Sequence, residues 1–384
     1  MEIITARPHR LEDELAQRIG ARLQAGERCM VLVPSQETLH TELALMERLA
    51  PEGSFVIDVL SPGRLRDRVF ERAGRPSRTV FDERGKRMVI TGILEREKDS
   101  LTVYGRAAEN GRESLAAKLS EVIACCKRSG VSAEELRLRA EQAQAPLAGK
   151  LADAALVYGR YEEQMAGRLA DMEDMLSEVR QRMERSAVVK GRHVFVTGFD
   201  MITPDFAEEL LCIAKAAASL CLLVESDANG APDGSLYAPV NASLERLKAA
   251  ARDQGVPVRA MHAERPLEGP EDLAALEARL FALGAEPCAG VPEHIRLLAV
   301  STQRREVQLA AAEIRRLAAS GVPLEEMAVL YPKATEYPAL LASVLPEYGI
   351  AAYTAEKRPA ASHPLARFLL NALTAKEGAS WHMQ

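Results

Sequence analysis

The stretch that decides the fold is Met30-Val-Leu-Val-Pro-Ser-Gln-Glu-Thr-Leu-His-Thr-Glu-Leu43. It opens with an uninterrupted apolar run, which is typical of a strand buried on both faces of a parallel sheet. Pro34 ends that strand, and a helical pattern follows directly, so Ser35, Gln36 and Thr38 fall in the turn. In open α/β sheets, ligands bind at the carboxyl ends of the strands. This turn is therefore a candidate ligand edge.

The strand before it predicts a sheet edge without a phosphate cradle. Glu2-Ile-Ile-Thr5 is a short β-branched run, and it leads into Ala6-Arg-Pro-His-Arg10. A phosphate loop needs glycines, whose N–H groups approach the phosphates, and a Lys-Ser/Thr pair for the outer phosphates and magnesium. Neither is present here. We therefore expect that ATP binding at this turn is lost.

Further strand candidates extend the same α/β pattern along the chain. Each is a short apolar or β-branched run followed by a turn and a helical pattern, which indicates parallel strands with crossover helices. They are Glu2–Thr5, Cys29–Val33, Phe55–Leu60, His193–Thr197, Ser219–Val224 and Val256–Ala260. Between the third and the fourth, a long segment rich in Ala, Leu, Glu and Arg, with few strand signals, predicts a helical region. The sequence thus predicts a sheet interrupted by a helical insertion.

A second, smaller α/β unit is predicted after a linker rich in Pro, Gly and Glu. Strands are expected at Ile295–Val300, Met327–Tyr331 and Ile350–Tyr353, with helices at Glu306–Ala319 and Tyr337–Tyr348. Three strands alone leave too much apolar surface uncovered for an independent domain. We therefore expect the chain to be a fragment. The predicted domains are 1–81 and 191–263 for the sheet, 82–190 for the insertion, 264–292 for the linker and 293–384 for the start of the second unit.

Bulk properties narrow the class of protein. The chain has 384 residues, of which 47% are hydrophobic and 27% charged, and its formal net charge is −6. That charge gives no global basic field, so any contact with nucleic acid must come from a local groove. The six cysteines show no metal-binding spacing, which favours a reducing cytoplasm, and no signal peptide or bilayer-spanning run is present. We expect a cytoplasmic protein without membrane contact.

Three sequence blocks together resemble a known family. They are Val31-Leu-Val-Pro-Ser-Gln-Glu-Thr38, Val59-Leu-Ser-Pro-Gly-Arg-Leu65 and His193-Val-Phe-Val-Thr-Gly-Phe-Asp-Met-Ile-Thr-Pro-Asp-Phe206. Weaker blocks lie at Lys150–Met165, Asp171–Leu176, Arg304–Val307, Met327–Tyr331, Tyr348–Ile350 and His363–Leu365. In this order they resemble the N-terminal half of AddB (RexB), the B subunit of the bacterial AddAB helicase–nuclease that processes double-strand DNA breaks.

The resemblance implies a superfamily I helicase-like fold: a 1A domain with a helical 1B insertion, followed by a partial 2A domain. It implies a degenerate helicase that binds single-stranded DNA and, in studied members, scans it for the short Chi sequence. The implied partners are an AddA-type helicase–nuclease subunit and DNA ends. The family's magnesium and 4Fe-4S cluster belong to a C-terminal nuclease half that is absent from this sequence, so no cofactor is expected here.

The family's nucleotide motifs are not matched. Some members keep a phosphate loop after the first strand, where this chain has Thr5-Ala-Arg-Pro-His-Arg10. An active enzyme of the superfamily would place adjacent Asp-Glu after His193–Thr197 for magnesium and water, where this chain has Gly198-Phe-Asp-Met201. Asp200 alone is a poor substitute. The resemblance therefore implies holding DNA rather than driving along it.

Gln36 and Thr38 have two interpretations. Amide and hydroxyl groups at a helix start can contact bases or phosphates, and the family's polar residues at these positions take part in Chi recognition. Alternatively, Ser35 or Thr38 caps the following helix, with Glu37 favoured by the helix dipole.

Arg64 and Phe199 complete the candidate DNA site. Arg64 follows the strand that ends at Leu60, and the family places an arginine here in the recognition site; an exposed arginine on a basic helix is the alternative. Phe199 stacks on a base or caps the sheet core. Where studied members have an aromatic residue and a Trp flanking the arginine, this chain has Pro62 and Asp67. The DNA sequence recognised is therefore expected to differ.

The leading hypothesis is thus a non-catalytic, DNA-binding part of an AddB-type subunit that acts in double-strand break repair. A pure assembly module that binds the motor subunit without contacting DNA is the alternative. A third interpretation, an α/β enzyme using Asp200 and Asp205 with a metal, is disfavoured, because residues five apart around a proline share no helix face. The lone histidines, His9, His40, His193, His262 and His363, show no metal-like spacing.

Overall fold

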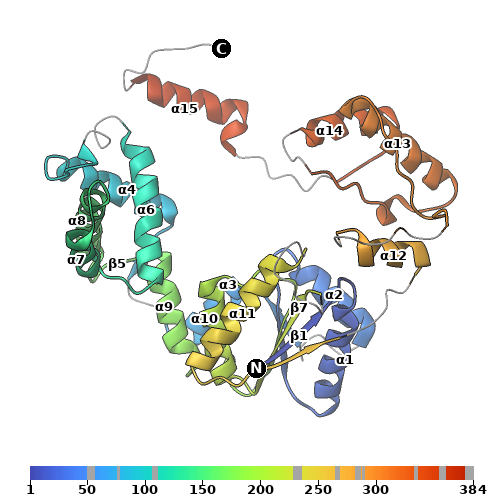
Figure 1. Ribbon diagram of the computed structural model, residues 1–384, viewed down its shortest axis with the longest axis horizontal. Helices are drawn as coiled ribbons and strands as arrows, with labels where there is room; N and C mark the ends of the chain where they lie inside the picture. The colour runs from blue at the N-terminus through green and yellow to red at the C-terminus, as the bar shows by residue number, and fades with distance from the viewer. Residues whose placement is uncertain are drawn as a thin grey trace. The chain divides into compact units, whose positions relative to one another are not determined.

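The chain forms an α/β unit with a helical insertion and a second, mainly helical unit, as a computed structural model describes (Figure 1). The structure describes residues 1–49, 57–75, 78–105, 111–227, 236–263, 269–281, 287, 290–332, 336–353 and 360–376. The first unit spans Met1–Ala289 and the second Gly290–Gln384. Phe55 and Val56, at the start of the third predicted strand, lie outside the described residues.

Within the described residues, six parallel strands form the central sheet of the first unit in the order β3-β2-β6-β7-β1-β8. They are β1 (Glu2–Ala6), β2 (Cys29–Leu32), β3 (Ile57–Leu60), β6 (His193–Val196), β7 (Ser219–Glu225) and β8 (Arg259–His262). The α/β fold predicted from the sequence is confirmed, and the parallel sheet is consistent with a helicase-like arrangement. The last strand begins three residues later than predicted, because Pro257 has no N–H to donate and the ladder with β1 starts at Arg259.

Helices cover both faces of the sheet. Alternate strand residues face opposite sides, so Ile3, Met30 and Leu32 join one core while Ile4 and Val31 join another. The first core is covered by α3 (Pro62–Ala73), α9 (Met172–Met183), α10 (Pro204–Ala216) and α11 (Ala238–Asp253), and the second by α1 (Leu11–Gln24) and α2 (Thr38–Leu49). This two-sided cover explains why the strands read as continuous apolar runs.

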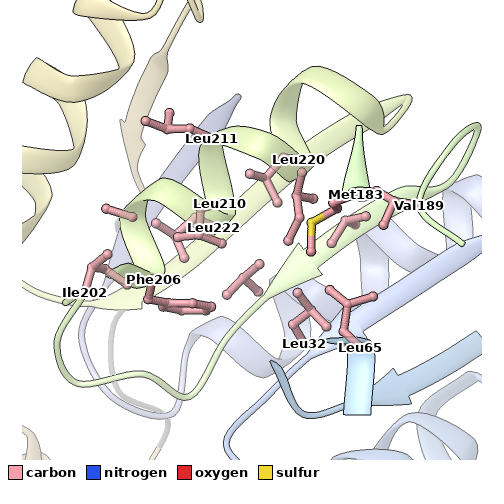
Figure 2. Packing of buried hydrophobic residues seen from close by; sticks show 14 of the residues in the cluster. Leu32, Leu65, Met183, Val189, Ile202, Phe206, Leu210, Leu211, Leu220 and Leu222 are labelled. Carbon is pink, nitrogen blue, oxygen red and sulfur yellow. The ribbon is translucent and has the colours of Figure 1, made fainter. Parts of the chain in front are cut away.

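The helical insertion is a compact body with its own core. It contains α4 (Glu83–Arg96), α6 (Arg112–Arg128), α7 (Ala133–Gln142) and α8 (Leu147–Met165). A two-stranded parallel ladder pairs β4 (Thr79–Val80), before these helices, with β5 (Leu169–Ala170), after them. The predicted insertion ran to residue 190, but α9 sends Met183 into the sheet core, where Figure 2 shows it beside Val189 and Leu220. The helix that returns from the insertion therefore anchors it to the sheet.

The second unit packs α13 (Gln303–Ala319) against α14 (Tyr337–Glu347) around a small cluster of buried side chains. Short 3-10 turns, η2 (Leu324–Glu326) and η3 (Ala360–Ser362), and α15 (Pro364–Lys376) complete its described elements. The strands predicted at Ile295–Val300, Met327–Tyr331 and Ile350–Tyr353 are wrong, because within the described segments none of them pairs with a neighbour. An apolar run becomes a strand only when another backbone accepts its ladder bonds.

α12 (Glu271–Arg279) lies in the segment predicted as a linker, and the contacts of the chain group it with the first unit. Among the residues that the structure describes, no helix is long and apolar enough to cross a membrane.

Candidate nucleic-acid interface

The carboxyl ends of three neighbouring strands carry the candidate residues. β2 pairs with β3 on one side and β6 on the other, in register at Leu32 with Leu60 and Val196. The chain leaves these strands toward Gln36, Arg64 and Phe199, respectively. Three side chains far apart in sequence therefore project from adjacent turns at one edge of the sheet.

Two of the four predicted residues line a common cavity. Gln36 and Phe199 are part of the wall of a cavity of about 350 Å³, whereas Thr38 and Arg64 are not. Gln36 is exposed to solvent. Phe199 is half-buried and packs against Phe206 with ring centroids 4.6 Å apart. Phe199 contacts the sheet core and also lines the cavity, so its position is compatible with both core packing and base stacking.

The hydroxyl of Thr38 forms a hydrogen bond within its own turn. Its hydroxyl donates a hydrogen bond to the carbonyl of Ser35 at 3.1 Å, and α2 begins at Thr38 itself. This contact is not the predicted capping bond, in which the hydroxyl would accept from a helix N–H. It fixes the turn that carries Gln36.

Arg64 stands at the start of α3 with an exposed side chain. Ser61 caps this helix by accepting the N–H of Arg64 at 3.3 Å, and Pro62 takes the first helical position. Other arginines of the helix are held by carboxylates: Arg66 by Glu209 at 2.9 Å and Arg68 by Asp58 at 2.8 Å. Within the described part of the chain no carboxylate pairs with Arg64, so its guanidinium is available to an anion.

Several residues that line the cavity were not predicted as binding residues from the sequence. His9 follows β1 and Glu225 ends β7, so both belong to the same strand-end edge. His40 and Arg48 lie on one face of α2, eight residues apart, and Arg48 bridges to Glu12 of α1 at 2.8 Å. The two signals that would have found them are the strand ends and the helical spacing that starts at Gln36.

The cavity is more acidic than basic. Among the described residues, Glu12, Glu37, Asp200 and Glu225 line it, against one arginine and two histidines. Burial raises the pKa of Glu225, and the nearby carboxylates of Asp200 and Glu12 raise it further, while His9 opposes them. Such a lining repels phosphate and suits groups that donate hydrogen bonds.

Asp200 and Asp205 do not form a metal site. Asp200 lines the cavity, whereas Asp205 lies in the first turn of α10 and pairs with Arg128 of α6 at 3.6 Å. Across the described ranges, no three His, Cys, Asp or Glu side chains are arranged to hold a metal ion. The Thr203 hydroxyl caps α10 by accepting the N–H of Phe206.

Comparison with known proteins gives a consistent result. Residues 7–277 match the family model described as ADDB, N-terminal. The chain is 33% identical to a protein of Desulforudis audaxviator over 91% of its own length and 31% of that protein's. It is 32% identical to one of Symbiobacterium thermophilum, over 96% of this chain and 33% of the relative. Both relatives are named as the B subunit of an ATP-dependent helicase/deoxyribonuclease. The chain thus spans about a third of the length of the curated relatives it matches.

Proposed function

Because this chain belongs to the AddB family, we propose that it is the DNA-holding, helicase-like part of the B subunit of a helicase–deoxyribonuclease. Its role is then in DNA repair and recombination, with an AddA-type subunit as the partner that supplies the ATP-driven motor. The relatives' names, which describe one subunit of a complex, support a partner. We also propose that the complex acts in the cytoplasm, on the ends of chromosomal DNA.

One observation carries the proposal: the order β3-β2-β6 places Arg64, Gln36 and Phe199 on three consecutive turns. A single strand that crosses the carboxyl edge of the sheet meets all three in sequence. Arg64 offers a charge for phosphate, Gln36 an amide for a base edge, and Phe199 a ring for stacking. These are the three kinds of contact on which binding of single-stranded DNA depends.

The local charges suit these residues to different parts of the DNA strand. Phosphate is suited to the start of α3, where Arg64 lacks a carboxylate partner within the described chain. The acidic cavity beside Gln36 and Phe199 disfavours phosphate and accommodates a base, whose amino groups donate hydrogen bonds to carboxylates. In this proposal the backbone follows α3 while a base enters the cavity.

The proposal includes the absence of ATP hydrolysis by this chain. The turn after β1 lacks the glycines and lysine of a phosphate loop, and the first turn of α1 carries Glu12, Asp13 and Glu14. Three carboxylates at a helix N-terminus satisfy the dipole that would otherwise attract phosphate. The family's magnesium and iron–sulfur cluster are proposed to lie in the part of the B subunit beyond this chain.

Recognition of a particular DNA sequence is proposed to differ from that of studied family members. Pro62 occupies the first position of α3, and Asp67 is exposed and lies 3.8 Å from Arg75. Neither residue offers an aromatic ring, and each missing stacking surface removes about 1–3 kcal/mol per base. A preference for a Chi-like sequence would then rest on Gln36 and Phe199.

Binding of a fluorescent single-stranded oligonucleotide, followed by anisotropy across a salt series, tests the proposal. We expect weak binding that falls with salt. Arg64→Ala should lower the slope of log affinity against log salt by about 0.7, as for one lost phosphate contact. Phe199→Ala should weaken binding about 5- to 100-fold with the slope unchanged.

Matched controls keep this test specific. Arg72→Ala removes another exposed arginine of α3, about 12 Å further along the helix. Gln181→Ala removes an exposed amide on α9, as a counterpart to Gln36→Ala. Loss of affinity in the controls but not in the site variants would contradict the proposal, as would ATP hydrolysis by the purified chain.

The alternative, an assembly module that does not contact DNA, has one observation in its favour. Leu39, Leu43 and Met46 form an apolar stripe on α2 and are 66%, 51% and 41% exposed. If this stripe binds the motor subunit and DNA runs elsewhere, Leu43→Asp will abolish co-purification with that subunit, while Gln36, Arg64 and Phe199 variants will keep wild-type DNA affinity.

A further inference from the structure

Two arginines in the turn between β1 and α1 hold the end of another helix. Arg10, only 7% exposed, donates from both terminal nitrogens to the two carboxylate oxygens of Glu277, each at 2.9 Å. Arg7 donates to the main-chain carbonyl of Glu277 at 3.1 Å and pairs with Asp227 at 3.2 Å. Both arginines thus act on one residue of α12, some 270 positions away in the sequence.

The contacts suit a helix C-terminus. Glu277 lies in the last turn of α12, where main-chain carbonyls lack partners within the helix and the dipole is negative. Arg7 supplies a donor to one of these carbonyls and a positive charge at the favoured end. The fork-to-fork pairing of Arg10 with the Glu277 carboxylate is the strongest geometry for an arginine–carboxylate contact.

Apolar packing contributes little to holding α12. None of its residues is buried, and Leu276 is 38% exposed. No α12 side chain belongs to the hydrophobic clusters found among the described residues. A helix without a buried face depends on its polar contacts for its position. The two arginines therefore supply polar contacts that hold α12 at the sheet edge.

The turn that holds α12 is the one in which α/β nucleotide-binding proteins cradle phosphate. A carboxylate and a phosphate present similar pairs of oxygens to an arginine fork. We propose that Glu277 occupies the anion position of this turn, so that α12, the helix leading to the second unit, is latched to the sheet without any nucleotide.

Hydrogen exchange of the whole chain, read on peptides covering Glu271–Arg279, tests the latch. Glu277→Gln keeps the shape and the main-chain carbonyl but removes the charge pair, so α12 amides should exchange about tenfold faster or more. Arg10→Gln should act alike. Glu271→Gln, an equal charge change in the first turn of the same helix, should leave the exchange near the wild-type rate.

A charge-swapped pair and a nucleotide arm sharpen the test. Arg10→Glu combined with Glu277→Arg should restore protection relative to either single change, and a thermal melt by circular dichroism should show the main transition unchanged in all variants. Magnesium-ATP should not alter the exchange of the wild-type helix. Unchanged exchange in both Glu277→Gln and Arg10→Gln would overturn the latch, as would faster exchange on adding ATP.

The latch does not depend on DNA binding. Anisotropy with single-stranded DNA on the same variants separates the two proposals: altered α12 exchange with no DNA binding in any protein sinks the proposed function and leaves the latch standing. Normal DNA binding with unaltered α12 exchange overturns the latch and leaves the proposed function standing.

Discussion

Gly198 and Pro34 hold the turns after β6 and β2 against each other. Gly198 has φ +79°, and a Cβ added there would lie 3.1 Å from the Cδ of Pro34. A glycine is needed twice over, for the left-handed backbone and for the close approach. This contact sets the spacing between Gln36 and Phe199, which line one cavity from these two turns.

Gly198→Ala is expected to destabilise the chain by about 1–3 kcal/mol, from the positive φ and the overpacking against Pro34. It should also weaken DNA binding, because the two turns must separate. Denaturant unfolding and anisotropy measure the two effects. Gly191→Ala is the matched control: its φ is +73°, but no atom lies within 4 Å of an added Cβ. Equal costs for the two variants would show that the contact with Pro34 is unimportant.

Much of the sheet could be predicted from the sequence, because its buried strands are short apolar or β-branched runs, each followed by a turn and a helical pattern. The turn at Pro34 could also be predicted, since it depends on residues adjacent in the chain. The strands expected in the second unit were wrong for the opposite reason. A run such as Ile295–Val300 has strand composition, but pairing is decided by a neighbouring backbone.

The candidate site was predictable only in part. Gln36, Arg64 and Phe199 follow strand ends, a local signal. The cavity's acidic lining and the latch at Glu277 arise from contacts between distant segments, such as that of Arg10 with a residue 267 positions away. Nothing in the turn Arg7–Arg10 alone indicates which carboxylate its arginines meet. Such pairings become visible only when the sheet order is known.

Substitution of Asp171 is expected to lower the stability of the insertion. It is 2% exposed in its side chain, accepts hydrogen bonds from Lys127 and the Tyr161 hydroxyl at 2.8 Å each, and caps α9 through the Asp174 N–H. Asp171→Ala removes the cap of α9 and one of the carboxylates around Lys127, which keeps Asp174 and Glu162 at 3.0 Å each, so the free energy of unfolding should fall by about 2–4 kcal/mol. Chemical denaturation checks this value.

The control for Asp171 is a residue that caps a helix and does nothing more. Asp82 accepts the Gly85 N–H at the start of α4 and is exposed. Asp82→Ala should cost about 1 kcal/mol, the usual value of a lost cap. If Asp171→Ala costs no more than Asp82→Ala, the buried network contributes nothing beyond capping.

Acid should destabilise the chain through carboxylates whose pKa is lowered on folding. Burial alone would raise the pKa of Asp58, but hydrogen bonds from Arg68 and Arg192 outweigh it and lower the pKa. The same balance, with Lys127 as the main partner, lowers the pKa of Asp171. A lowered pKa adds stability above the unfolded value of about 3.9, and this stability is lost as the pH falls through the folded pKa.

We therefore expect the free energy of unfolding to decline below about pH 5. In a pH series of urea titrations, Asp58→Asn should flatten this decline, because the substituted side chain no longer takes up a proton on unfolding. If the free energy of unfolding falls with pH at the same slope in wild type and Asp58→Asn, this carboxylate does not contribute to the loss of stability in acid.

Asp153 is expected to order the segment at Thr102–Tyr104. Its buried carboxylate accepts the N–H groups of Thr102, Val103 and Tyr104 at 2.8–2.9 Å, and the Thr102 hydroxyl at 3.0 Å. Asp153→Ala leaves three backbone donors without this acceptor, so we expect a loss of about 3 kcal/mol. Asp153→Asn retains one carbonyl oxygen and should cost less. Because this segment packs in the core of the insertion and does not line the cavity beside Gln36, DNA affinity at low temperature should stay at the wild-type value. A stability loss that is accompanied by loss of DNA binding would instead place the insertion in the DNA path.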